Sequence, residues 1–273
     1  MEAIASKAPA GAAERMKPAY PTIKESWGFL GWYILVALLV GVPLYLLAEF
    51  VLKLPASVSF MLITIASNLA LFSFLRWKNG KQRLALHLAA PQPLWLYTTL
   101  PLLVVAEVLV LTLLQYLHLP NWSESFFKEL IREPVSALFT GVILAPVLEE
   151  LLFRGVLLQG LLRNYRPWVA IGQSSLLFGL VHFNPAQSLS AAFGGVLLGW
   201  LYYRTRSLWV CIAAHALHNL LAFGSILLFL DASDTMMLFG SSWVYAGAVL
   251  ISAVVLTVLL RRIYQATKPL VEA

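Results

Sequence analysis

Long apolar stretches, rarely interrupted by charge, are the dominant feature of this sequence of 273 residues. Most approach the length of about 20 residues that a helix needs to cross the hydrocarbon core of a bilayer. Within lipid, only helices and closed β-barrels satisfy their own backbone hydrogen bonds, and these stretches lack the alternating pattern of barrel strands. The sequence therefore predicts an all-α fold, a polytopic bundle of transmembrane helices.

Composition agrees with a membrane protein and argues against several other classes. Charged residues make up 12% of the chain, whereas soluble domains carry about 25%. The net charge of +6 is spread over short segments, so we expect no nucleic-acid partner. Cys211 is the single cysteine, which excludes an intrachain disulfide and a cysteine-based metal site. The first 24 residues do not resemble a signal peptide, and we expect the first span to remain as an anchor.

About eight spans are predicted, and the distribution of basic residues orients them. The spans lie near 27–51, 58–74, 95–117, 136–162, 168–183, 189–203, 208–230 and 243–260, of which the fifth and sixth are short for a full crossing. With the N-terminus inside, the inner segments hold 15 of the 19 Lys and Arg residues, the outer segments hold three, and Arg154 lies within a span. This bias predicts that both termini are cytoplasmic.

The predicted organisation is a single transmembrane domain with short polar ends. We expect a polar cytoplasmic N-terminal segment at 1–26, the transmembrane domain at 27–262 with its functional core at about 135–230, and a cytoplasmic tail at 263–273. Segment 121–134 mixes aromatic and charged residues, which predicts a short interfacial helix on the outer face. Ala191, Gly195 and Gly199 recur every fourth residue, and this spacing predicts close packing of the sixth span.

The fourth predicted span contains three ionisable residues, although such residues cost about 2.5–3.5 kcal/mol each in a membrane helix. Glu150 and Arg154 are four residues apart and can pair on one helix face. Glu149 points about 100° away from Glu150 and has no evident partner on its own helix. Pro146 precedes the acids and can kink the helix beside them. A buried ion pair that only fixes helix orientation is the structural alternative.

Further polar residues lie in later spans at similar depths. His182 is near the end of the fifth span, and His215 and Asn219 share one face of the seventh, with His218 on a neighbouring face. Counted from the expected cytoplasmic ends, Glu149 and His182 lie roughly 21 and 22 Å deep, His215 roughly 12 Å and Asn219 roughly 18 Å. A satisfied core histidine or an interhelical hydrogen bond is the structural alternative for each. Glu107, near the middle of the third span, has no partner that the sequence identifies and is left outside the predicted site.

A carboxylate, histidines and an amide in a membrane cavity suit hydrolysis by water. Glu149 could act as general base with His182 holding the water, while His215 and Asn219 donate hydrogen bonds to an oxyanion. Zinc bound by a glutamate and two histidines is the nearest alternative. However, no His-Glu-x-x-His motif is present, and the sequence indicates no partner that would orient the histidines. We therefore expect no metal and no other cofactor.

Three motifs resemble those of the CPBP family, which groups type II CAAX prenyl endopeptidases with bacteriocin-processing and self-immunity membrane proteins. They are Glu-Glu-x-x-x-Arg at 149–154, Phe-x-x-x-His at 178–182 and His-x-x-x-Asn at 215–219. The resemblance implies a glutamate-dependent intramembrane endopeptidase without a catalytic metal, acting on a membrane-associated protein or peptide. By motif position, Glu149 and His182 would activate water and His215 and Asn219 would form the oxyanion hole. Glu150, Arg154 and Phe178 would support them.

Other functions remain open at this point. Some members of the family are described as non-catalytic immunity or scaffold proteins. A proton or ion pathway could use Glu107, Glu149 and the histidines, but the sequence has no repeated half of the kind common in transporters. The compact loops favour the prokaryotic cell membrane as the location, and the endoplasmic reticulum membrane is the expectation if the chain is eukaryotic.

Overall fold

The computed structural model describes residues 19–83, 92–130, 132–228 and 238–268, and nearly all of these are helical, with no strand among them. The all-α prediction is therefore confirmed. In chain order the α-helices are α1 (Ile23–Val36), α2 (Val42–Leu46), α3 (Ala56–Arg83), α4 (Leu94–Leu111), α5 (Glu124–Leu130), α6 (Pro134–Leu138), α7 (Ala145–Glu150), α8 (Gln159–Asn164), α9 (Pro167–Leu180), α10 (Pro185–Thr205), α11 (Leu208–Leu228) and α12 (Ser242–Ala266).

Wider π-helical segments join several of these helices into long rods. Ala37–Gly41 and Leu47–Val51 extend α1 and α2 into one rod, and a 3₁₀ segment at Thr112–Leu117 extends α4. In the rod from α6 to α8, π-helical segments at Phe139–Leu144 and Leu151–Leu158 flank α7 on both sides. Interruptions of this kind occur often at functional sites. Here the π-helical segments flank the short helix that carries Glu149 and Glu150, the two glutamates of the predicted site.

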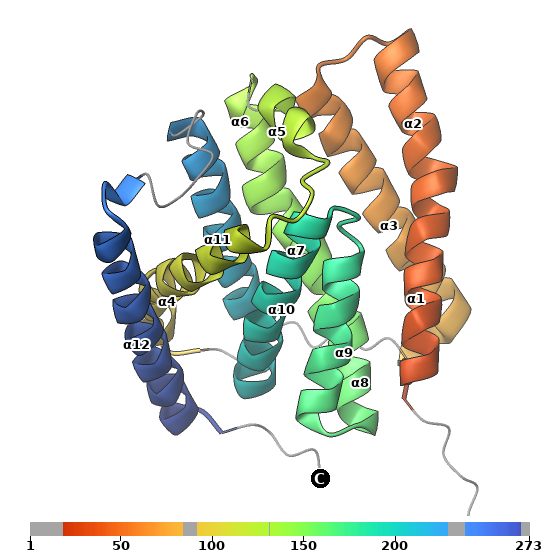
Figure 1. Cartoon of the computed structure of the whole chain (residues 1–273). Helices are drawn as coiled ribbons and strands as arrows, with labels where there is room; N and C mark the ends of the chain where they lie inside the picture. Colours follow the sequence, from red (N-terminus) through yellow and green to blue (C-terminus); the bar gives the residue numbers. More distant parts are fainter. Residues whose placement is uncertain (1–18, 84–91, 131, 229–237, 269–273) are drawn as a thin grey trace, which may run out of the picture.

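The chain is an integral multi-pass membrane protein. Within the described residues, six helical rods are long and apolar enough to cross a bilayer: Ile23–Val51, Ala56–Lys78, Leu94–Leu117, Pro134–Asn164, Leu208–Leu227 and Ser242–Ala266. The first rod begins and α12 ends at the same end of the bundle (Figure 1). This arrangement agrees with two termini on one side of the membrane. The assignment of that side to the cytoplasm stays a prediction.

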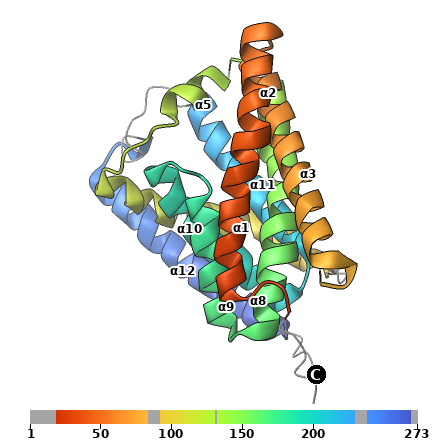
Figure 2. The same ribbon diagram turned by 90° about the vertical axis from the view of Figure 1, so that its right-hand side faces the viewer.

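The fifth and sixth predicted spans correspond to α9 and α10, which pack against each other as a hairpin. At 14 residues, α9 is roughly 21 Å long, whereas the hydrocarbon core is about 30 Å thick. The turn between the two helices lies near mid-height of the bundle in both orientations (Figures 1 and 2). The hairpin therefore brings the residues of its turn to the depth of the membrane interior. The count of eight crossings stays a prediction.

Two predicted helix boundaries shift at the ends of the domain. The first helix begins at Ile23 because Thr22 and Glu25 form a capping box that satisfies exposed backbone N–H groups. At the other end, α12 continues to Ala266. The domain boundaries at 26 and 262 stay predictions, and most of segment 1–26, part of tail 263–273 and the last two residues of span 208–230 lie outside the described residues. The predicted short helix within 121–134 is present as α5.

The close packing predicted from small residues is confirmed between α9 and α10. A Cβ atom on Gly195 would lie 3.2 Å from the Cα of Ser175 and 3.2 Å from Cδ1 of Phe178. On Gly199 it would lie 3.2 Å from Cγ2 of Ile171. Small residues at this spacing let two helix backbones approach closely.

Gly179→Ala is expected to lower the free energy of unfolding by about 1–3 kcal/mol, the usual cost of overpacking. The added Cβ would lie 2.5 Å from the carbonyl oxygen of Ser188, so the two helices must separate. Thermal unfolding in detergent micelles measures the effect. Gly172→Ala is the matched control, because among the described residues no atom comes within 4 Å of its Cβ, and alanine favours a helix. Equal stability of the two variants would contradict the prediction.

Candidate active site

One cleft of about 550 Å³ contains the four residues predicted to carry the chemistry. Glu149 comes from α7, His182 from the turn after α9, and His215 and Asn219 from α11, and all four line this cleft. Segments that lie far apart in the sequence therefore meet at one place, as the motifs predict. The catalytic roles of these residues stay predictions.

A buried ion pair lies next to the residues of the cleft. The Nη1 atom of Arg154 lies 2.7 Å from Oε1 of Glu150, and both side chains are almost completely buried. The pairing predicted from their spacing is confirmed. Arg154 also donates from Nη2 to the carbonyl oxygen of Gly195 at 3.2 Å, which ties the pair to α10. A charge pair at this depth is tolerated only because each charge compensates the other.

Glu150 also orients His215, a contact that the sequence does not indicate. The Nδ1 atom of His215 lies 2.8 Å from Oε1 of Glu150, the oxygen that Arg154 also contacts. An ionised carboxylate can only accept, so Nδ1 carries the proton. The other ring nitrogen, Nε2, lies 3.8 Å from Oε2 of Glu149. His215 therefore stands between the two glutamates and can donate from Nε2 only when its ring is doubly protonated.

Phe178 fixes His182 and packs against the rest of the site. Its carbonyl oxygen lies 2.8 Å from Nδ1 of His182, and because a carbonyl only accepts, this nitrogen carries the proton. In the neutral ring, Nε2 is then a hydrogen-bond acceptor. The Phe178 ring contacts the rings of His182 and His215 edge to face at 5.1 and 5.6 Å, and Cζ of Arg154 lies 4.5 Å from its centre. One aromatic side chain thus holds three polar groups in place.

Asn219 is held at the cleft by the π-helical segment before α7. Its Nδ2 donates to the carbonyl oxygen of Gly141 at 2.7 Å. An amide nitrogen carries two N–H donors, so a second remains for a ligand in the cleft. A Cβ atom on Gly141 would clash with the Phe223 ring, and only glycine allows this close approach.

The turn that carries His182 is fastened to the segment before α5. Asn184 accepts from the backbone N–H of Trp122 at 3.0 Å and donates to Oδ1 of Asn121 at 2.9 Å. The N–H of Ala186 donates to the carbonyl oxygen of Pro120 at 3.2 Å. Irregular backbone at membrane depth needs such internal partners. Neither Asn121 nor Asn184 has a motif spacing that would have identified these contacts from the sequence.

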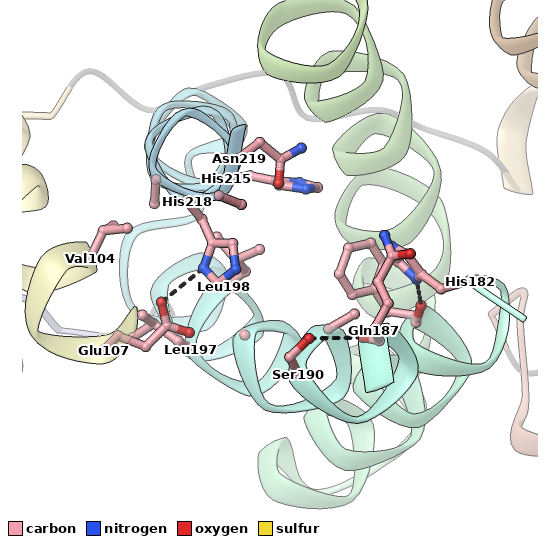
Figure 3. Close-up of a pocket in the computed structure, with 15 residues that line it drawn as sticks. Val104, Glu107, His182, Gln187, Ser190, Leu197, Leu198, His215, His218 and Asn219 are labelled. Atoms are coloured by element: carbon pink, nitrogen blue, oxygen red, sulfur yellow. Dashed lines mark hydrogen bonds and ion pairs between the residues drawn. The ribbon is translucent and has the colours of Figure 1, made fainter. Parts of the chain in front are cut away.

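Glu107 also has a partner, His218, although the sequence gives none. The Nδ1 atom of His218 lies 3.1 Å from Oε2 of Glu107, and the pair lies beside His215 and Asn219 (Figure 3). The two residues are 111 positions apart in the sequence. The sequence signal for them is that each is an ionisable residue inside a predicted membrane span. Within the described parts of the chain, no three His, Cys, Asp or Glu side chains are grouped closely enough to hold a metal ion.

Comparisons with known proteins match the segment that builds this cleft. The family described as type II CAAX prenyl endopeptidase Rce1-like matches residues 131–221, which include all three motifs. A Bacillus subtilis (strain 168) protein named "Putative membrane peptidase YdiL" is 35% identical over 77 residues, which are 28% of this chain and 32% of that protein. The chain thus aligns with about a third of this relative's length. No solved structure matches the chain. The resemblance to the CPBP family is confirmed.

Proposed function

We propose that this chain, whose segment 131–221 belongs to the type II CAAX prenyl endopeptidase family, hydrolyses peptide bonds at its membrane cleft. The observation that carries the proposal is the convergence of Glu149, His182, His215 and Asn219 on one cleft. The substrate is a membrane-associated protein or peptide. A family match over a third of the chain and a relative named as a membrane peptidase support the same activity.

Water is activated by Glu149 and His182. The Glu149 carboxylate takes one proton from a water molecule, and Nε2 of His182 accepts a hydrogen bond that holds this water. The water oxygen then bonds to the carbonyl carbon of the peptide. When the C–N bond breaks, the proton held on Glu149 passes to the leaving nitrogen. This scheme needs no serine or cysteine nucleophile, because water itself attacks.

His215 and Asn219 stabilise the negative charge on the carbonyl oxygen during this attack. Asn219 donates the N–H that Gly141 does not occupy, and His215 donates from Nε2 as an imidazolium. The carboxylates of Glu149 and Glu150, on either side of that ring, stabilise its positive charge. Donors fixed before the reaction cost no reorganisation when charge develops, which makes them effective in a site with little water.

Asn219→Ala is expected to lower kcat by about 10²–10³-fold and to change KM little, because the lost donor acts only on the developing oxyanion. Steady-state cleavage of one peptide by the purified variant measures both constants. Gln173→Ala is the control, since it removes an amide that bonds Ser26 on α1 outside the cleft. A rise in KM without loss of kcat would show that Asn219 only binds substrate.

Comparative membrane proteomics tests the proposal in cells. Strains that express the wild-type chain or the Glu149→Gln variant at equal levels are compared for the termini of membrane-associated proteins. We expect at least one processed terminus to disappear in the variant strain. Identical termini in both strains, with each protein present in the membrane, would contradict a protease function.

A further inference from the structure

A smaller pocket, which we call the Glu107 pocket, lies beside the active-site cleft. It has a volume of about 140 Å³, and the Glu107–His218 pair is part of its lining (Figure 3). His182, His215 and Asn219 line both the cleft and this pocket, so the two spaces adjoin at the predicted reaction centre. Drug-sized ligands need about 300–1,000 Å³, and this pocket therefore suits a single side chain.

Glu107 has an oxygen that lacks a partner. The residue is 6% exposed, and its Oε2 contacts His218. Its Oε1 is buried and makes no hydrogen bond with any residue in the described part of the chain. A buried acceptor without a donor is costly, more so when it is charged. The carboxylate thus requires a hydrogen-bond donor from whatever fills the pocket.

Gly194 keeps the space beside this oxygen open. A Cβ atom at this position of α10 would lie 3.3 Å from Oε1 of Glu107 and 3.8 Å from Cε1 of His218. Every larger residue would occupy the approach to the carboxylate. Ser190, one helical turn earlier on α10, lines the same pocket, and its hydroxyl oxygen can accept a second hydrogen bond.

The charges around the cleft and the Glu107 pocket favour a ligand with a positively charged group. Among the described residues, the carboxylates of Glu107 and Glu149 line the pocket and the cleft, and that of Glu150 bonds to His215 in their lining. Arg154, which pairs with Glu150, is the one permanent cation in this group. Only one oxygen of Glu107 is unoccupied. A guanidinium binds best through two parallel hydrogen bonds, whereas an ammonium is a compact charge that suits one oxygen.

We propose that the Glu107 pocket binds a lysine side chain of the polypeptide being cut, at a position next to the scissile bond. The ammonium contacts Oε1 of Glu107, and the aliphatic stem passes His215 and Asn219. This inference rests on the proposed function, because the pocket is useful as a subsite only if the cleft cuts polypeptides.

Peptide cleavage by the full-length chain in lipid nanodiscs tests the subsite. A mixture of synthetic peptides of diverse sequence first identifies one that the wild type cuts. Variants of this peptide then carry lysine, norleucine, arginine or alanine at each position flanking the cut. Norleucine is the matched control, because it keeps the aliphatic stem and lacks the ammonium. At one position we expect kcat/KM for lysine to exceed that for norleucine by about tenfold, the effect of one charge-assisted hydrogen bond.

Two protein variants separate the subsite from a general structural effect. With Glu107→Gln, the ratio of kcat/KM for lysine over norleucine is expected to fall towards one. With Gly194→Ala, which places a methyl group beside Oε1 of Glu107 and narrows the pocket, lysine and norleucine peptides should both lose rate relative to the alanine peptide. A wild type without lysine preference, or a parallel loss for all four peptides in Glu107→Gln, would overturn the proposal.

Binding distinguishes failure of the subsite from failure of the proposed function. If no peptide is cut, the Kd values of fluorescent lysine and norleucine peptides are measured for wild type and Glu107→Gln. A roughly tenfold tighter binding of the lysine peptide that Glu107→Gln abolishes would support the lysine subsite and contradict the protease function. Equal binding of both peptides would reject the pocket, whether or not the cleft cuts polypeptides.

Discussion

Replacing Glu149 with glutamine is expected to lower kcat by about 10²–10⁴-fold, the usual contribution of a general base. Glutamine keeps the size of the side chain and its place beside His215 but cannot take a proton from water. The side chain is 22% exposed, and its loss of charge should leave folding intact. Cleavage of one peptide by equal amounts of purified wild type and variant measures the effect.

The control for this experiment is Glu124→Gln on α5. It removes the same charge from an exposed glutamate that pairs with Lys128 outside the cleft. We expect wild-type kcat for this variant and unchanged elution of both variants in size-exclusion chromatography. Normal turnover by Glu149→Gln would rule out Glu149 as the base.

Arg154→Met is expected to lower the free energy of unfolding by about 3–5 kcal/mol, because it leaves the Glu150 carboxylate buried without its main partner. Glu150 is fully buried and its contact with Nη1 of Arg154 is 2.7 Å. The variant should also lose activity, since Glu150 orients His215. Unfolding in mixed micelles of increasing denaturing detergent measures stability, and peptide cleavage measures activity.

A comparison of two ion pairs with the same spacing shows whether burial causes this effect. Glu124 and Lys128 are also four residues apart and 2.8 Å from each other, but both side chains are more than half exposed. Breaking that pair with Glu124→Gln should barely change stability. The double variant Glu150→Gln with Arg154→Met should be more stable than Arg154→Met alone, because no unpaired charge remains. Wild-type stability of Arg154→Met would contradict the prediction.

The sequence predicts most of the transmembrane rods because apolar length and helical rise are local properties. It is less informative about α9 and α10, whose lengths in the membrane depend on how they pack against each other and against the other helices. Hydropathy also does not reveal the capping box at Thr22, which moves the start of the first helix. Small residues at fixed spacing did predict the close contact of α10.

The contacts within the site also divide into those that local sequence spacing predicts and those that depend on packing between helices. The pairing of Glu150 with Arg154 follows from helical spacing, which fixes which side chains share a face. The contacts of Glu150 with His215 and of Glu107 with His218 join residues 65 and 111 positions apart. They depend on how each helix is rotated about its axis and how deep it lies. Neither property is encoded in a single motif, so these partners emerge only from the three-dimensional arrangement.

The hydrogen bonds between Asn184 and the loop before α5 have a consequence for natural variation. Residues 120–122 occupy a connecting loop, a location where insertions and deletions are normally tolerated. Here the loop length affects the position of the turn that carries His182, because Trp122 and Asn121 bond to Asn184 in that turn. A one-residue deletion in this loop should therefore disable the cleft while leaving every membrane-crossing helix intact.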